Sequence, residues 1–166
     1  MKKFLLCVAT VFLLATLTFT SISEAQRIII IRDSPRANQN VNTKNFPQEV
    51  LRLVNVERAK VGLRPLKFSN DLAASAYVRA TELPKKFSHT RPNGTKCFTA
   101  MPSGGRILGE NLAGGQKTPS QVVQAWMDSP GHRDNILGKK YTELGVVYYY
   151  QPNSKYKHYW VQHFRG

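Results

Sequence analysis

The spacing of apolar residues changes along this chain, and that change restricts the fold more than any other sequence feature. In residues 46–83 and 118–129 apolar side chains recur every three or four positions, which predicts amphipathic helices. Residues 142–151 and 157–164 are instead rich in Val, Tyr and Trp, which predicts a β-hairpin. Helices followed by a hairpin predict an α+β sandwich with antiparallel strands.

Boundary residues divide the helical region. Lys44 or Asn45 can precede the first helix, which is expected to have Pro47 in its first turn and to end at Gly62. Ser69 can cap a second helix that runs to Pro84, and Thr118 can cap a third that Ser129-Pro130-Gly131 ends. A short helical turn is expected from His132 to Leu137.

The last predicted strand carries large side chains on both faces. Tyr159, Val161 and His163 share one face, whereas residues 160, 162 and 164 share the other. A sheet that contains such a strand is expected to be covered on both faces.

The N-terminal 25 residues have the composition of a signal peptide. Lys2 and Lys3 precede an uncharged apolar run from residue 4 to about residue 19, and the small residues Ser23 and Ala25 follow. We expect cleavage after Ala25 and a secreted, extracellular protein, which can also associate with the cell wall. The alternative is an uncleaved membrane anchor.

Residues 26–45 are expected to form a leader or linker ahead of the domain. The Ile28–Ile31 run is too short to cross a bilayer, and it can be an edge strand, an extended adhesive segment or part of the export signal. The residues that follow it are polar and rich in Asn.

Cleavage after Ala25 leaves 141 residues, a formal charge of +13 instead of +14, and one cysteine, Cys97. An internal disulfide is then excluded, so the domain, expected to be a monomer, depends on a hydrophobic core. The charge predicts attraction to an anionic cell-envelope polymer, glycan or lipid, and secretion makes nucleic acid an unsuitable partner. The alternative interpretation of the charge is general solubility.

Four polar segments occur in a specific order: Phe87–Gly94 (FSHTRPNG), Gly109–Ala113 (GENLA), Trp126–Asn135 (WMDSPGHRDN) and Glu143–Val147 (ELGVV). Together they resemble the CAP superfamily of cysteine-rich secretory, antigen 5 and pathogenesis-related proteins, in its small secreted bacterial form. The resemblance covers about residues 46–164 and implies an SCP-like domain at 46–166. It implies a three-layer α-β-α sandwich with a central antiparallel sheet.

The resemblance also implies a cleft in which two histidines and two acidic residues meet, a site that binds zinc or another divalent cation in some members. The matching residues are His89, His132 and Glu110. The second acidic position falls on Ser129, which departs from the pattern, and Asp128 or Glu143 can substitute for it. Asn111 of the GENLA segment completes the candidate cleft residues.

The residue types by themselves agree with a metal site but do not require one. Two imidazoles and one carboxylate can hold zinc and leave a fourth position to water, yet these residues lack the close spacing of strong metal motifs. His89 can instead bond the backbone of its loop, His132 can cap a turn, and Glu110 can accept amides near a helix start. No cofactor is therefore required.

Four further groups have structural interpretations. His158 and His163 are expected on opposite faces of one strand, and His163 is expected to be a hydrogen-bonded, partly buried residue that can approach the cleft. Cys97 is expected to be a small buried apolar residue. Tyr148, Tyr149 and Tyr150 are expected to divide between core and exposed surface, where they can stack on sugars.

Two classes of function remain. The first is a non-enzymatic extracellular binding module acting at the cell envelope or on an external partner. The second is a metal-assisted hydrolase of peptide or glycan with Glu110 as general base. The sequence contains no Gly-x-Ser-x-Gly motif, and Ser129 is better explained as a helix end than as a nucleophile. A purely structural role is disfavoured because the polar motif residues exceed what packing needs.

Overall fold

The computed structural model describes residues 43–166 of the chain. The expected signal peptide, the Ile28–Ile31 run and nearly all of the expected leader lie outside these residues. Within the described part, no helix combines the length and the apolar character that a membrane span requires. The last leader residues, Thr43–Asn45, form a single 3₁₀ turn, η2, directly ahead of the first long helix.

Helices precede most of the strands, as the change of apolar spacing predicts. The elements in chain order are η2 (Thr43–Asn45), α2 (Phe46–Lys60), β1 (Lys67–Phe68), α3 (Asn70–Glu82), η3 (Cys97–Ala100), β2 (Leu108–Gly114), α4 (Pro119–Asp128), α5 (Pro130–Ile136), β3 (Glu143–Tyr150) and β4 (His158–Arg165).

Three of the four helix starts use the predicted residues. The Ser69 hydroxyl accepts a hydrogen bond from the amide of Leu72, and the Thr118 hydroxyl accepts one from Gln121. Pro47 lies in the first turn of α2, although Asn45 makes no side-chain cap. The fourth helix, α5, begins at Pro130 and not at residue 132, because proline fits the first turn of a helix.

The four strands form one sheet in the order β1-β3-β4-β2. The predicted hairpin is confirmed: β3 and β4 pair antiparallel, and β4 also pairs antiparallel with β2. The expectation of an antiparallel sheet is wrong at one edge, where the two residues of β1 pair parallel with Glu143 and Leu144 of β3. So short a strand carries no period-2 pattern that a sequence could display.

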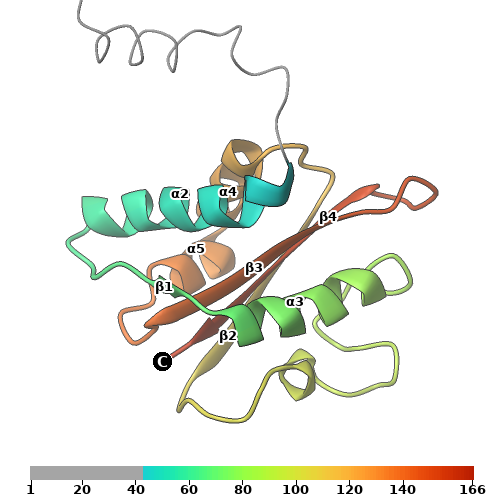
Figure 1. Cartoon of the computed structure of the whole chain (residues 1–166), viewed down its shortest axis with the longest axis horizontal. Helices are drawn as coiled ribbons and strands as arrows, with labels where there is room; N and C mark the ends of the chain where they lie inside the picture. The colour runs from blue at the N-terminus through green and yellow to red at the C-terminus, as the bar shows by residue number, and fades with distance from the viewer. Residues whose placement is uncertain (1–42) are drawn as a thin grey trace, which may run out of the picture. The chain divides into compact units, whose positions relative to one another are not determined.

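Helices cover both faces of the sheet, so the predicted three-layer α-β-α sandwich is confirmed (Figure 1). Helices α2, α4 and α5 pack on one face, where Trp126 and Trp160 are fully buried. Helix α3 packs on the other face, against Tyr159 and Val161. The alternation predicted for the last strand therefore matches two separate hydrophobic layers.

The GENLA segment forms strand β2, and this corrects the suggestion that Glu110 lies near a helix start. The strand is an edge strand held by β4 on one side, and the indole Nε1–H of Trp126 donates to the Leu112 carbonyl at 3.1 Å. Gly, Glu and Asn have low strand propensity, so tertiary contacts override the local preference here.

Candidate functional site

Glu110 lies at the centre of a polar cluster between the edge strand β2 and helix α3. The register pairs Glu110 with His163 of β4, so both side chains point to the face that α3 covers. The Glu110 side chain is 1% exposed. A carboxylate at such a position needs hydrogen-bond donors that replace water.

Three side chains supply those donors. Arg79 donates through Nε to Oε2 at 2.9 Å and through Nη2 to Oε1 at 3.4 Å. His89 Nδ1 lies 2.8 Å from Oε1, and His163 Nε2 lies 3.1 Å from Oε2. Burial by itself raises the pKa of Glu110, but the bonds from His163, His89 and Arg79 outweigh it and hold that pKa far below its usual range. Glu110 is therefore an ionised carboxylate whose two oxygens are both occupied.

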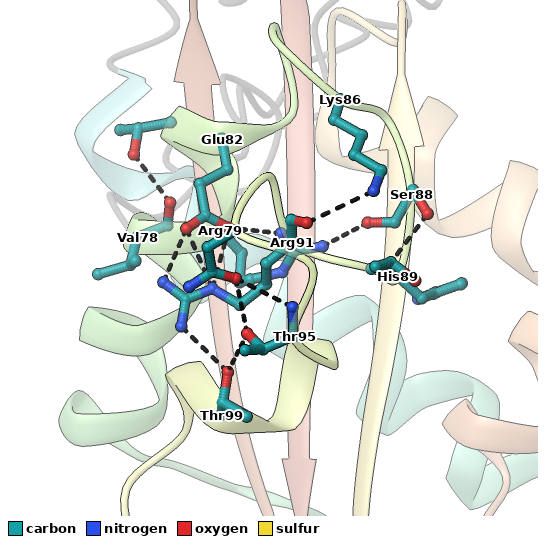
Figure 2. A network of polar contacts seen from close by, with 12 residues as sticks. Val78, Arg79, Glu82, Lys86, Ser88, His89, Arg91, Thr95 and Thr99 are labelled. Carbon is teal, nitrogen blue, oxygen red and sulfur yellow. Dashed lines mark hydrogen bonds and ion pairs between the residues drawn. The ribbon is translucent and has the colours of Figure 1, made fainter.

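A chain of alternating charges leads from Glu110 to the surface, and Figure 2 shows its part from Arg79 through Glu82 and Arg91 to Thr99. The fully buried Arg79 also donates to Glu82 at 2.6 Å, and Glu82 accepts from Arg91 at 2.7 Å. Arg91 in turn reaches the hydroxyl of Thr99 at 3.1 Å. Because Arg79 also donates to the Ser88 carbonyl, this chain ties the loop that carries His89 to helix α3.

The geometry around His89 determines which nitrogen is free. An ionised carboxylate only accepts hydrogen bonds, so His89 Nδ1 must carry the proton that it shares with Glu110. In the neutral ring the lone pair then resides on Nε2. The His89 side chain is 59% exposed, and a carboxylate that holds one imidazole nitrogen in this way orients the other for a ligand.

The expectation that His163 is a hydrogen-bonded histidine is confirmed, and its burial is complete. Its Nε2–H donates to Glu110, and its Nδ1 lies 2.7 Å from the Ser75 hydroxyl. Burial is the main cause that lowers the pKa of His163, so the ring is neutral at neutral pH. The Ser75 hydroxyl, which also lies 2.9 Å from the Leu72 carbonyl, contacts Nδ1, so both ring nitrogens have a polar partner.

Cys97 is buried, as expected, and it also borders the cluster. Ligand atoms of His89, Cys97 and Glu110 all lie within 4.8 Å of one another. Burial, and after it the charge of Glu110, raises the pKa of Cys97 to about 11, so the thiol is protonated and unreactive at neutral pH. The amide of Cys97 donates to the His89 carbonyl at 2.9 Å, which links the two residues through the backbone.

A cavity of about 400 Å³ opens beside this cluster along β2, and we call it the β2-edge cleft. Its walls include His89, Cys97, Phe98, Glu110 and Asn135. The side chain of Phe98 is exposed, so the cleft offers an apolar surface next to the polar cluster.

His132 and Asn111 approach from the other face of the sheet. Adjacent strand residues point in opposite directions, so Asn111 faces α5, where it donates to the His132 carbonyl at 3.0 Å and accepts from Asn135 at 2.8 Å. The His132 ring is half-buried. Burial first, and the nearby charge of His89 second, lower the pKa of His132. The ring of His132 therefore lies within electrostatic range of His89.

The candidates for a second acidic residue lie elsewhere. Glu143 accepts from Arg165 at 2.6 Å at the start of β3, and the exposed Asp128 accepts from Gln124 on α4. Ser129 ends α4 and precedes α5, as its interpretation as a helix end predicts. His158, on the face opposite His163, contacts the Tyr148 hydroxyl at 2.7 Å, and among the three tyrosines Tyr150 is the exposed one.

Sequence reasoning missed Arg79 and the chain of charges that it starts. A signal was available: Arg79 lies three residues after Ala76 on the apolar stripe of α3, where a charged side chain must find a buried partner. Ser75 carried no such signal, because a serine inside a helix is common.

Comparison with known proteins agrees with the fold and the motifs. The CAP family model, described as the cysteine-rich secretory protein family, matches residues 51–164. The uncharacterized protein YkwD of Bacillus subtilis (strain 168) is 43% identical over 108 residues, which are 62% of this chain and 42% of that protein. The chain spans less than half the length of the curated relatives that it matches.

Solved structures show the same sandwich. An extracellular protein with an SCP domain from Bacillus anthracis has a TM-score of 0.63 and 26% identity, over 80% of this chain and 43% of that one. An outer surface protein of Borrelia burgdorferi has a TM-score of 0.66 and 22% identity, over 75% of this chain and 95% of that one. The second likeness concerns the fold alone.

Proposed function

Because the chain belongs to the cysteine-rich secretory protein (CAP) family, we propose that it is a non-enzymatic extracellular binding module acting at the cell envelope or on an external partner, with a divalent metal ion held in the β2-edge cleft. The observation that carries the metal proposal is the state of His89. Its Nδ1 is held by Glu110, and its exposed ring leaves Nε2 free. This arrangement is typical of metal-ligating histidines.

The residues around His89 fit a zinc-type ion. As the second ligand we propose the half-buried His132, whose ring lies within electrostatic range of His89, with water or a partner's oxygen completing the coordination. Glu110 acts by orienting His89, because its own oxygens are occupied by Arg79, His163 and His89. A bound ion would supply a Lewis-acidic point that coordinates oxygen atoms of the partner.

Because both carboxylate oxygens of Glu110 already accept hydrogen bonds, the structure argues against the metal-assisted hydrolase. A general base must reach a water molecule with a free lone pair and a pKa not far below the working pH. Glu110 is 1% exposed and its pKa lies far below the usual range, so it is a poor base. Binding without turnover is the function that the geometry supports better.

Zinc titration by calorimetry tests the metal site. We expect His89→Ala to abolish binding, His132→Ala to weaken it by about a hundredfold, and Glu110→Gln to weaken it by about 10–100-fold, since Glu110 acts through His89. Cys97→Ala should leave the affinity within about twofold. His158→Ala is the matched control, because that histidine lies on the opposite face of β4.

Two results would change the assignment. Loss of zinc binding in Cys97→Ala with full binding in His132→Ala would make His89, Cys97 and Glu110 the ligand set. Unchanged affinity in His89→Ala would overturn the proposed site. Circular dichroism of every variant separates loss of a ligand from loss of the fold.

Hydrolysis assays test the absence of turnover. The zinc-loaded protein should release no product from cell-wall glycan or peptide above the rate of the His89→Ala variant. Product release that requires both His89 and Glu110 would instead establish the hydrolase. Mass spectrometry of the exported protein, expected to start near Gln26, tests the extracellular location.

A further inference from the structure

A second cavity, of about 600 Å³, lies at the end of the sheet where the chain enters β1 and β3. Its walls come from the connection between α2 and β1 and from the connection between α5 and β3, which Figure 1 shows at the same end of the sheet. It shares no lining residue with the β2-edge cleft. We call it the basic pocket.

Three exposed cations line the basic pocket: Arg64, Lys67 and Lys139. Within residues 43–166, none of them has a carboxylate within ion-pair distance. The acidic wall residue, Glu143, is already held by Arg165 at 2.6 Å. The pocket therefore keeps three positive charges that are neutralised by no neighbouring side chain in the described part.

The buried Arg58 holds both walls in place. Its guanidinium donates to the Arg64 carbonyl at 2.9 Å on one wall, and to the Gly138 and Tyr141 carbonyls at 3.0 and 3.4 Å on the other. Arg58 is 1% exposed and also has no ion pair within the described residues. It thus adds a fourth positive charge behind the pocket, one that backbone carbonyls solvate and no carboxylate neutralises within the described residues.

We propose that the basic pocket binds a phosphate group carried by a larger polar molecule, namely the phosphodiester of an envelope polymer. Phosphate matches one arginine and two lysines on the walls of a single pocket better than a single carboxylate does, because it presents several charged oxygens. The volume exceeds that of a bare phosphate, so it leaves room for the attached polyol or sugar. The site goes beyond the metal cleft and does not depend on it.

The experiment is a titration of the purified, isotope-labelled protein with a short glycerol-phosphate oligomer, followed by NMR at fixed ionic strength. We expect the largest shifts in the amides of residues 62–67 and 139–143. The triple variant Arg64→Gln/Lys67→Gln/Lys139→Gln should bind at least about tenfold more weakly. The matched control Lys85→Gln/Lys155→Gln/Lys157→Gln removes the same charge elsewhere and should change the affinity by less than about twofold.

Each outcome decides for or against the basic pocket. Equal weakening in both triple variants would mean that the whole surface charge binds the polymer, and shifts outside residues 62–67 and 139–143 would overturn the site. Binding to phosphatidylglycerol vesicles without binding to the oligomer would assign a membrane surface instead. His89→Ala should bind the oligomer like the unmodified protein. The test of the basic pocket therefore does not depend on whether the metal proposal is correct.

Discussion

Two arginines occupy apolar helix faces in this protein, and each is buried with a different compensation. Arg79 on α3 is paired with Glu110 and Glu82, whereas Arg58 on α2 is satisfied by backbone carbonyls of Arg64, Ile136 and Gly138. Removing one partner of a buried ion pair leaves the other charge unpaired in a medium that solvates it poorly. The loss of folding free energy therefore comes mainly from the buried charge that remains without a partner.

We expect Arg79→Ala to lower the free energy of unfolding by about 3–5 kcal/mol, because Glu110 and Glu82 lose their shared partner. Arg52→Ala is the control, since its pair with Glu49 is largely exposed, and it should cost less than about 0.5 kcal/mol. Urea unfolding followed by circular dichroism measures both. Equal small effects would show that the buried chain of charges contributes little.

Acid should destabilise the protein in two steps. The pKa of His163 is lowered by burial, so the unfolded state binds the extra proton first and stability falls as pH drops below about 6.5. The pKa of Glu110 is lowered despite burial, so a second loss begins below about pH 5, where the unfolded carboxyl protonates.

Unfolding free energies across this pH range test both steps. His163→Gln should reduce the dependence between about pH 7 and 5, where His132 also contributes, and Glu110→Gln should reduce it below about pH 5, where Asp71 and Glu82 also contribute. The measured quantity is the slope of the unfolding free energy against pH, which a general loss of stability does not change. A Glu49→Gln variant at the exposed pair is the control for the lower window.

At the scale of elements, α3 lies so close to β3 that one position between them has no room for a side chain. A Cβ at Gly145 would lie 2.2 Å from the backbone of Leu72 and Ala73. Backbone atoms cannot move aside like the end of a flexible side chain. This contact sets how closely α3 can approach the His163 side of the sheet.

Gly145→Ala should therefore lower the free energy of unfolding by about 3 kcal/mol or more, through overpacking of α3 against β3. Gly131→Ala provides the opposite case: Gly131 lies inside α5 with open space where a Cβ would stand, so alanine should stabilise by about 0.5–1 kcal/mol. Urea denaturation of the two variants gives the comparison. A tolerated Gly145→Ala would mean that α3 moves away from the sheet.

At the scale of the whole molecule, the charge of the chain, formally +14, sets long-range attraction to anionic polymers. Such attraction reaches about 10 Å at 0.1 M salt and about 3 Å at 1 M salt, so cosedimentation with isolated cell-wall material should weaken steeply over that range. The variant in which His89 and Glu110 are both replaced by Ala should cosediment like the unmodified protein. Binding that persists in high salt and disappears in that variant would favour recognition by the β2-edge cleft.

The sequence by itself determined the helices, the hairpin and the covering of both sheet faces. Apolar spacing defines which side of an element faces the core. Ser69 and Thr118 mark helix starts by capping backbone amides, and Pro47 marks one because proline fits the first turn. The resemblance of the motifs supplied His89, Glu110 and His132 as a set. Neither source indicated how the three side chains are used.

The tertiary structure decided that use, because it depends on contacts between residues far apart in the chain. Only the β2–β4 register places His163 beside Glu110, and only the packing of α3 brings Arg79 to the same carboxylate. These contacts occupy Glu110 and leave Nε2 of His89 free. The parallel strand β1 and the strand character of residues 108–114 were likewise decided by neighbouring strands, since two residues or a Gly-Glu-Asn run carry too little local preference to specify a strand.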